Sequence, residues 1–301
     1  MGLVRRITLL TNPDVCNLCC PLCFLHQRGR SFGDISGFYG EMDFDVARRA
    51  LEKYGSVVDE NGNRILKEVI PSTMGEPLLY SHFGELLSLC RSLRIPMNLT
   101  TNGTFPGEWL SDNGMRNLLS ACSDIKVSSL ASECCSGWKK NVERLLDVRR
   151  KLTAADTSGD KRGPSLTTIS IQATLHRKNL MMIPELIAWA TAVGIDRIKW
   201  NKVVFLSSAS VSQKDEYALD RSEGELRDYI QSCSKLCGSD LRNEGSLFME
   251  RKQNDRFSQE NGTCPFAEEL WIMPDGSEQH CPHPERRFGN ANTVEAQCCF
   301  I

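Results

Sequence analysis

The chain has 301 residues, of which 41% are hydrophobic and 25% charged, and its formal net charge is −2. This composition is typical of a globular protein with a sizeable core, and the lack of a basic excess argues against nucleic acids and anionic membranes as partners. No apolar run approaches the roughly 18 residues that a membrane-spanning helix needs. The N-terminus lacks the apolar core of a signal peptide, so we expect a cytoplasmic protein.

Strand-like and helix-like segments alternate along the first 240 residues. Hydrophobic periodicity predicts six strands, at residues 4–10, 65–70, 97–101, 124–129, 168–175 and 197–206. It predicts helices between and after them, at residues 43–54, 79–93, 109–121, 138–152, 180–193 and 223–236. Successive β–α units imply a parallel sheet covered by helices. Since six units are fewer than a closed barrel needs, we predict an α/β fold, a partial (β/α)6 TIM-like barrel.

Polar stretches divide the rest of the chain. Residues 154–164, 207–224 and 243–262 are predicted to be loops. We place the barrel at residues 1–240, a linker at 241–262 and a small C-terminal extension at 263–301. A glycine-rich insertion at residues 29–40 is either a lid over a substrate or a surface loop.

Fourteen cysteines are many for this chain, and four of them lie between Cys16 and Cys23. Secreted disulfide scaffolds are short and carry a signal peptide, and neither property applies here. In a reducing compartment, clustered thiols indicate a metal site and scattered thiols act as small buried hydrophobic residues. We therefore expect Cys90 and Cys122 to pack on apolar helix faces. Trp200 is also predicted to belong to the core.

The loop after the first strand contains the spacing C-x3-C-x2-C through Cys16, Cys20 and Cys23. Thiolates are the preferred ligands of iron–sulfur clusters. Three of them leave one iron of a [4Fe–4S] cube open, and an open iron can bind a small molecule. Because Cys19 adds other spacings, a zinc site and inert thiols remain alternatives.

This spacing, directly after the first strand of a β/α barrel, resembles the radical S-adenosylmethionine (radical SAM) superfamily. The resemblance implies that Cys16, Cys20 and Cys23 hold a [4Fe–4S] cluster whose open iron binds S-adenosylmethionine. Reductive cleavage of that cofactor gives a 5′-deoxyadenosyl radical, which abstracts hydrogen from a substrate carbon. Leu22 would lie beside the adenine through its backbone, at a position that is commonly aromatic in the family.

A second motif, Met74-Gly75-Glu76-Pro77, ends the second strand. Glycine permits close backbone approach and proline suits the first helical turn, so the motif alone describes an ordinary strand-to-helix turn. It resembles the Gly-Gly-Glu-Pro motif of the same family, with methionine in place of the first glycine. The resemblance implies that the backbone at Gly75, Glu76 and Pro77 binds the amino group of the cofactor.

Polar residues on later strands extend the candidate cofactor site. Asn102 follows the third strand and is either a cofactor contact, as in relatives, or part of a turn. Lys126 and Ser128 share one face of the fourth strand, and Gln172 lies on the fifth. Buried polar side chains need partners, and the resemblance offers the cofactor as one.

The tail resembles the start of the SPASM/twitch-like auxiliary-cluster extension of many relatives. Its Pro274-Asp275-Gly276 turn predicts a hairpin, which would bring Cys264 and Cys281 together. Cys298 and Cys299 are the remaining candidate ligands of a second iron–sulfur cluster. Zinc, with the histidines that flank Cys281, and a hairpin without metal are the alternatives.

The resemblance implies an enzyme that carries out an oxidation or forms a bond on a small metabolite or a peptide. It also implies an electron donor such as flavodoxin or ferredoxin, and no nucleic-acid or membrane partner is expected. The first strand begins by residue 4, which favours a small molecule or an unassisted peptide as substrate. A non-catalytic zinc or iron–sulfur module for binding or electron transfer is the alternative.

Overall fold

The computed structural model describes residues 3–24, 40–71, 74–155, 167–206, 209–248 and 268–279. Most of the glycine-rich segment 29–40, expected as a lid or a surface loop, and the cysteines at 264, 281, 298 and 299 lie outside these residues. The described chain forms two compact units. The first contains the described residues up to Thr100, together with Leu206 and residues 268–279, and the second contains the described residues from Thr101 to Phe205 and from Ala209 to Phe248.

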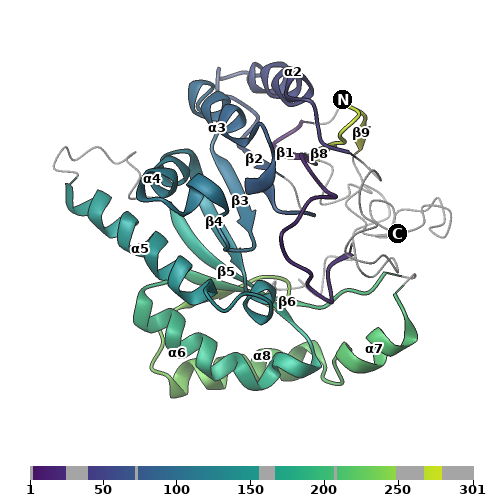
Figure 1. Ribbon diagram of the computed structural model, residues 1–301, viewed down its shortest axis with the longest axis vertical. Coiled ribbons are helices and arrows are strands. Elements are labelled where there is room, and N and C mark those ends of the chain that lie inside the picture. The colour runs from purple at the N-terminus through teal and green to yellow at the C-terminus, as the bar shows by residue number, and fades with distance from the viewer. Residues whose placement is uncertain are drawn as a thin grey trace. The chain divides into compact units, whose positions relative to one another are not determined.

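The first unit is a mostly parallel sheet with two helices. Its strands follow one another in the order β3-β2-β1-β8-β9, and only β9 is antiparallel to its neighbour. The strands are β1 (Arg6–Leu9), β2 (Glu68–Pro71), β3 (Met97–Thr101), β8 (Glu269–Ile272) and β9 (Glu278–Gln279). Helices α2 (Phe44–Gly55) and α3 (Phe83–Ser92) lie side by side in Figure 1.

Both helices of the first unit bury the apolar stripe that predicted them. Helix α2 buries Ala47, Ala50 and Leu51, and Asp43 caps its first turn by accepting a hydrogen bond from the Asp45 backbone nitrogen. Helix α3 buries Phe83 and Cys90 on its inner face. Burial raises the pKa of the Cys90 thiol to about 12, so this cysteine is a packing residue, as predicted.

The second unit is a parallel sheet with its helices on one side (Figure 1). Its strands, in the order β7-β6-β5-β4, are β4 (Cys122–Ser128), β5 (Thr168–Leu175), β6 (Arg197–Lys202) and β7 (Arg242–Glu244). Its helices are α4 (Asp112–Ala121), α5 (Trp138–Ala155), α6 (Ile183–Val193), α7 (Val211–Tyr217) and α8 (Glu223–Leu236). Every second residue of β5 is apolar and buried, as are Ile198 and Trp200 of β6, which confirms the predicted place of Trp200 in the core.

These strands and helices confirm the predicted α/β class, but some boundaries were wrong. The sixth strand ends at Lys202 rather than at residue 206, and the predicted loop 207–224 contains α7. Ser210 and Gln213 form a capping box that starts α7. The segment was predicted to be a loop because its sequence is mostly polar. Cys122 is buried as predicted, but it begins β4 instead of lying on a helix.

The predicted C-terminal hairpin is confirmed at the Pro274-Asp275-Gly276 turn, where β8 and β9 pair in antiparallel fashion. Gly276 takes a φ of 83°, and Asp275 accepts a hydrogen bond from the Ser277 backbone nitrogen at 2.9 Å. The sequence did not reveal that β8 pairs in parallel with β1. The tail therefore extends the sheet of the first unit.

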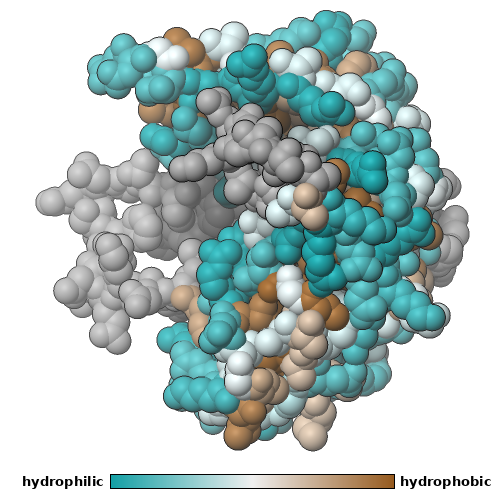
Figure 2. Space-filling view, turned by 90° about the vertical axis from the view of Figure 1, so that its left-hand side faces the viewer, coloured by the Kyte–Doolittle hydropathy of each residue, from teal (hydrophilic) through white to brown (hydrophobic). Residues whose placement is uncertain are grey.

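The face of the described chain that Figure 2 shows is mostly hydrophilic, with hydrophobic residues in smaller patches among the hydrophilic ones. No helix among the described segments combines the length and the apolar character needed to cross a membrane.

A buried carboxylate, Asp124, organises the polar face of the second sheet. It accepts hydrogen bonds from Ser170 Oγ at 2.6 Å, Arg197 Nη2 at 2.7 Å and Lys199 Nζ at 2.9 Å. Burial by itself raises the pKa of Asp124, but the hydrogen bonds from Ser170 and Lys199 and the nearby positive charges outweigh it. The pKa of Asp124 therefore lies below its ordinary value.

We predict that Asp124→Asn lowers the free energy of unfolding by about 2 kcal/mol at neutral pH, because two half-buried cations lose a charged partner. The pKa of Asp124 is lower in the folded than in the unfolded state, so its stabilisation is lost as the pH falls through the folded-state value. In urea unfolding, the difference in the free energy of unfolding between wild type and variant should become smaller below about pH 4.

Asp112→Asn is the matched control, because Asp112 forms an exposed ion pair with Arg144 at 2.9 Å. Such pairs contribute little, so the control should unfold almost like the wild type. Two results would contradict the role given to Asp124: an equal loss of unfolding free energy in the two variants, or a difference between wild type and Asp124→Asn that grows in acid.

Candidate cofactor site

The loop that follows β1 carries the cysteine triad on a defined backbone. Cys16, Cys20 and Cys23 are half-buried, whereas Cys19 is exposed. The Leu18 backbone nitrogen donates a hydrogen bond to Cys16 Sγ at 3.4 Å. The Cys23 backbone nitrogen donates to the Cys20 carbonyl at 3.0 Å. Three half-buried cysteines therefore lie within eight residues of one loop, and Cys19 differs from them in exposure.

The second motif lies directly against the entry to this loop. The Glu76 backbone nitrogen donates to the Val15 carbonyl at 2.8 Å, and Asn12 Nδ2 donates to the Glu76 carbonyl at 2.8 Å. Gly75 has a φ of 73°, and a Cβ there would lie 2.3 Å from the Asn12 carbonyl oxygen and 2.7 Å from that of Val15. Only glycine fits this close approach, so the structure brings together the two motifs that the sequence singled out.

Buried polar groups also stabilise this joint, the contact between the start of the cysteine loop and Gly75–Glu76. Thr11 Oγ1 donates to Asn12 Oδ1 at 2.8 Å, which orients the amide that binds Glu76. Glu76 is 1% exposed, and its carboxylate accepts a hydrogen bond from the Leu78 backbone nitrogen at 3.3 Å. Pro77 begins the short 3-10 helix η1 (Pro77–Leu79), and Leu22 is buried on the cysteine loop. Glu76 thus caps the turn that its own motif starts.

Three candidates of the second unit lie on the polar face of its sheet. Lys126, Ser128 and Gln172 are half-buried, and the strand register places Ser128 beside Gln172. Asn102 Oδ1 accepts hydrogen bonds from the Thr104 backbone nitrogen at 2.9 Å and from its hydroxyl at 2.7 Å. The turn expected at Asn102 is confirmed, and its contact with a cofactor stays a prediction.

The donor chemistry of the cysteine loop limits the metal group that it suits. In the part of the chain that the structure describes, no three Cys, His, Asp or Glu side chains are grouped as ligands of a metal ion. A structural zinc site takes four ligands, and the spacing singles out three thiols, Cys16, Cys20 and Cys23. Thiolates are the preferred ligands of iron–sulfur clusters, and three of them leave one iron of a [4Fe–4S] cube open. The residue types of this loop therefore suit such a cluster.

A cavity of about 380 Å³ in the second unit was not foreseen from the sequence. It lies where β5 ends, and its walls include Trp138, Ala173, Trp200 and His176. His176 is 1% exposed, and its Nε2 lies 2.8 Å from Glu133 Oε1. Its Nδ1 has no hydrogen-bond partner in the described chain. A single histidine after a strand carries no periodic signal, so only the fold reveals this pair.

Comparison by sequence finds a limited similarity to a curated protein. No protein-family profile matches the chain. The PqqA peptide cyclase of Xanthomonas axonopodis pv. citri (strain 306) is 30% identical over 129 residues, which make up 42% of this chain and 32% of that protein. The matched stretch thus spans about a third of the relative.

Comparison by structure finds the same architecture in several solved proteins. Streptococcus suis SuiB bound to S-adenosylmethionine superposes with a TM-score of 0.63 at 16% identity, over 93% of this chain and 60% of SuiB. SuiB bound to its precursor peptide SuiA gives 0.63 at 15% identity, over 100% of this chain and 63% of SuiB. The anSMEcpe structure with AdoMet and the Cp18Cys peptide gives 0.57 at 16% identity, over 92% and 74% of the two chains. At these identities the likeness establishes the fold, and it confirms the predicted α/β class.

We predict that Gly75→Ala lowers the free energy of unfolding by about 3 kcal/mol, because a methyl group overlaps two carbonyl oxygens and alanine is strained at positive φ. Chemical unfolding of the purified protein measures the loss. Gly84→Ala in α3 is the control, since no atom lies within 4 Å of its added Cβ and its φ is ordinary. Equal stability of the two variants would rule out the close approach at Gly75.

Proposed function

Given the resemblance of this chain to the radical SAM superfamily, in its motifs and in its fold, we propose that it is a radical SAM enzyme that acts on a peptide. The observation that carries the proposal is the joint between the cysteine loop and Gly75–Glu76. Two motifs about 60 residues apart in sequence are held together by backbone hydrogen bonds, in the order and at the strand ends that the superfamily uses.

The cysteine loop is the proposed site of a [4Fe–4S] cluster, with Cys16, Cys20 and Cys23 as ligands. Such a cluster supplies the electron that cleaves S-adenosylmethionine into methionine and a 5′-deoxyadenosyl radical, which takes a hydrogen atom from the substrate. The hydrogen bond from Glu76 to Val15 fixes the loop one residue before Cys16. Gly75 has no side chain, so its backbone can approach the cofactor closely.

Further residues of the chain are proposed as cofactor contacts. Leu22 would contact the adenine through its backbone, and Gly75, Glu76 and Pro77 would face the amino group. Asn102, Lys126, Ser128 and Gln172 are polar and at least partly accessible, so they can bind the ribose and the carboxylate. The ammonium group of Lys126 suits an anionic partner.

The tail is proposed to hold a second iron–sulfur cluster through Cys264 and Cys281, with Cys298 and Cys299 as further ligands. The β8–β9 hairpin supports this proposal, because it lies between the first two of these cysteines in sequence. An electron donor such as flavodoxin or ferredoxin would reduce the enzyme, and the cytoplasm is the proposed compartment.

A peptide is the proposed substrate because the curated relative and the two solved proteins compared above are named with one. The curated relative is a peptide cyclase by name, and the SuiB and anSMEcpe structures hold a precursor peptide and the Cp18Cys peptide. The enzyme would remove a hydrogen atom from a carbon of the peptide, which leads to oxidation or to a new bond. The chain must then orient the substrate and exclude water and oxygen from the radical.

We predict that Cys20→Ala abolishes both iron binding at the loop and cleavage of S-adenosylmethionine. The neighbouring Cys19→Ala should retain both, since Cys19 lies outside the C-x3-C-x2-C spacing and is exposed. The measurements are iron content after anaerobic purification, about four irons per cluster, and 5′-deoxyadenosine formed with dithionite. A wild-type protein with zinc and no iron would favour the binding module instead.

We also predict the source of the hydrogen atom. A deuterium-labelled extract of the source cells, separated into peptides and small metabolites, is incubated with enzyme and unlabelled S-adenosylmethionine. Deuterium should appear in 5′-deoxyadenosine with the peptide fraction and should be absent with Cys20→Ala. Deuterium that comes only from the metabolite fraction would refute a peptide substrate while leaving the radical chemistry intact.

A further inference from the structure

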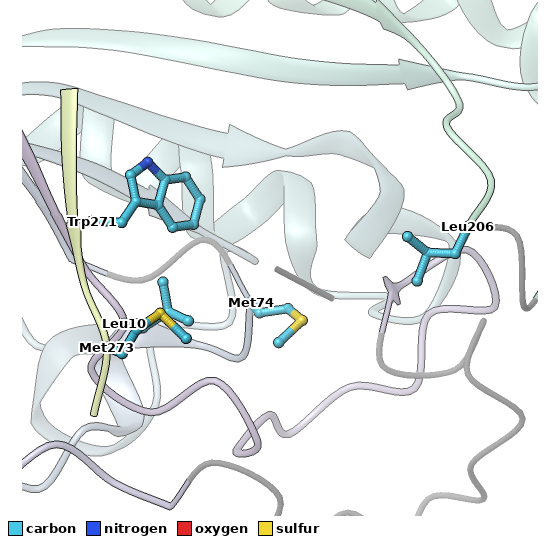
Figure 3. Close-up of a cluster of buried hydrophobic side chains, with 5 residues drawn as sticks. All are labelled: Leu10, Met74, Leu206, Trp271 and Met273. Carbon is cyan, nitrogen blue, oxygen red and sulfur yellow. The ribbon is translucent and has the colours of Figure 1, made fainter. Parts of the chain in front are cut away.

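An apolar cluster lies beside the last thiol of the cysteine triad. Figure 3 shows its side chains, with Trp271 and Met273 on the same tail segment and Met74 between Leu10 and Leu206. All five are at most 7% exposed: Leu10, Met74, Leu206, Trp271 and Met273. Cys23 and Phe24 pack against this cluster. One side of the cysteine loop therefore faces hydrocarbon and thioether groups.

The tail supplies two members of this apolar cluster, Trp271 in strand β8 and Met273 directly after it. The register of β8 with β1 places Trp271 beside Thr8, and the Leu10 backbone nitrogen donates to the Ile272 carbonyl at 2.9 Å. The Trp271 Nε1 donates to Glu269 Oε1 at 2.9 Å. The polar atom of the indole is thus satisfied on its own strand, and the ring adds only apolar surface to the cluster.

Met74 supplies the centre of the cluster. It occupies the position of the first glycine in the family's Gly-Gly-Glu-Pro motif, and it is 3% exposed. Met74 directly precedes Gly75 in the sequence, and the backbone of Gly75 packs closely against Asn12 and Val15. The position of Met74 is therefore set by the same joint that holds the cysteine loop, and a flexible thioether fills the space there.

We infer that this apolar cluster insulates the iron–sulfur site of Cys16, Cys20 and Cys23, with Met74 and Trp271 as positioning residues that set its reduction potential. The inference rests on the proposed function. An apolar shell controls solvent access and the local dielectric, and through them the potential of a metal site. It also keeps water and dioxygen from the Cys23 side.

The direction of the effect follows from charge. A cubane held by three thiolates becomes more negative when it gains an electron. An apolar surrounding stabilises added charge less than water does, so it disfavours the reduced form. The apolar cluster of side chains therefore makes the reduction potential of the iron–sulfur cluster more negative. The reduced iron–sulfur cluster is then a stronger reductant, which suits cleavage of a sulfonium.

The test compares Met74→Ala and Trp271→Ala with the wild type after anaerobic cluster assembly. Redox titration should give a less negative midpoint potential in both variants. The cluster absorbance should bleach in air about tenfold faster, the scale on which changes around a metal site act. Met74→Leu conserves volume and apolar character, so it should behave like the wild type.

Met97→Ala is the matched control, because Met97 is a fully buried methionine of β3 that is not a member of the apolar cluster. It should lose stability without changing the potential or the bleaching rate. If Met74→Ala does not fold, the nearly isosteric Met74→Gln places a polar group at the same point and should also raise the potential. Potentials and bleaching rates that match those of Met97→Ala would overturn the inference.

The iron content of the wild type separates this inference from the proposed function. A wild-type protein without iron would refute the proposed function itself. A wild type that holds the cluster and cleaves S-adenosylmethionine, with variants of unchanged potential, would refute only the insulating role of Met74 and Trp271.

Discussion

The candidate site depends on one close backbone contact, in which Gly75 and Glu76 pack against Asn12 and Val15. A residue with a Cβ cannot occupy position 75, because two carbonyl oxygens lie within 2.7 Å of where that atom would be. The Glu76–Val15 and Asn12–Glu76 hydrogen bonds then fix the strand-end motif to the start of the cysteine loop. A loop of eight residues with four cysteines gains a defined position from this contact, and the apolar cluster around Met74 follows from it.

The sequence predicted those parts of the fold that have a strong hydrophobic period. Strand β5 and helix α8 occur at the predicted residues, and β3 has the predicted bounds. The three residues of β7 are polar and too few to show a period, so only pairing with β6 defines that strand. The pairing of β8 with β1 joins residues more than 250 positions apart, which no local pattern reveals.

The candidate site was predictable where residue type and spacing carry the chemistry. The thiols of Cys16, Cys20 and Cys23 and the glycine of the second motif belong to this class. The packing of Trp271 and Met273 near Cys23 was not predictable, because it requires the tail to extend the sheet. The Glu133–His176 pair was missed for a similar reason, since 43 residues separate its members and neither lies in a motif.

The central claim is that the cysteine loop holds a cluster with one open iron that binds S-adenosylmethionine. Its most direct test is the electron paramagnetic resonance spectrum of the reduced, anaerobically prepared protein, recorded with and without that cofactor. The account predicts a [4Fe–4S] signal that changes shape when S-adenosylmethionine is added, because the cofactor coordinates the cluster itself. A signal that the cofactor leaves unchanged, or no cluster signal at all, would contradict it.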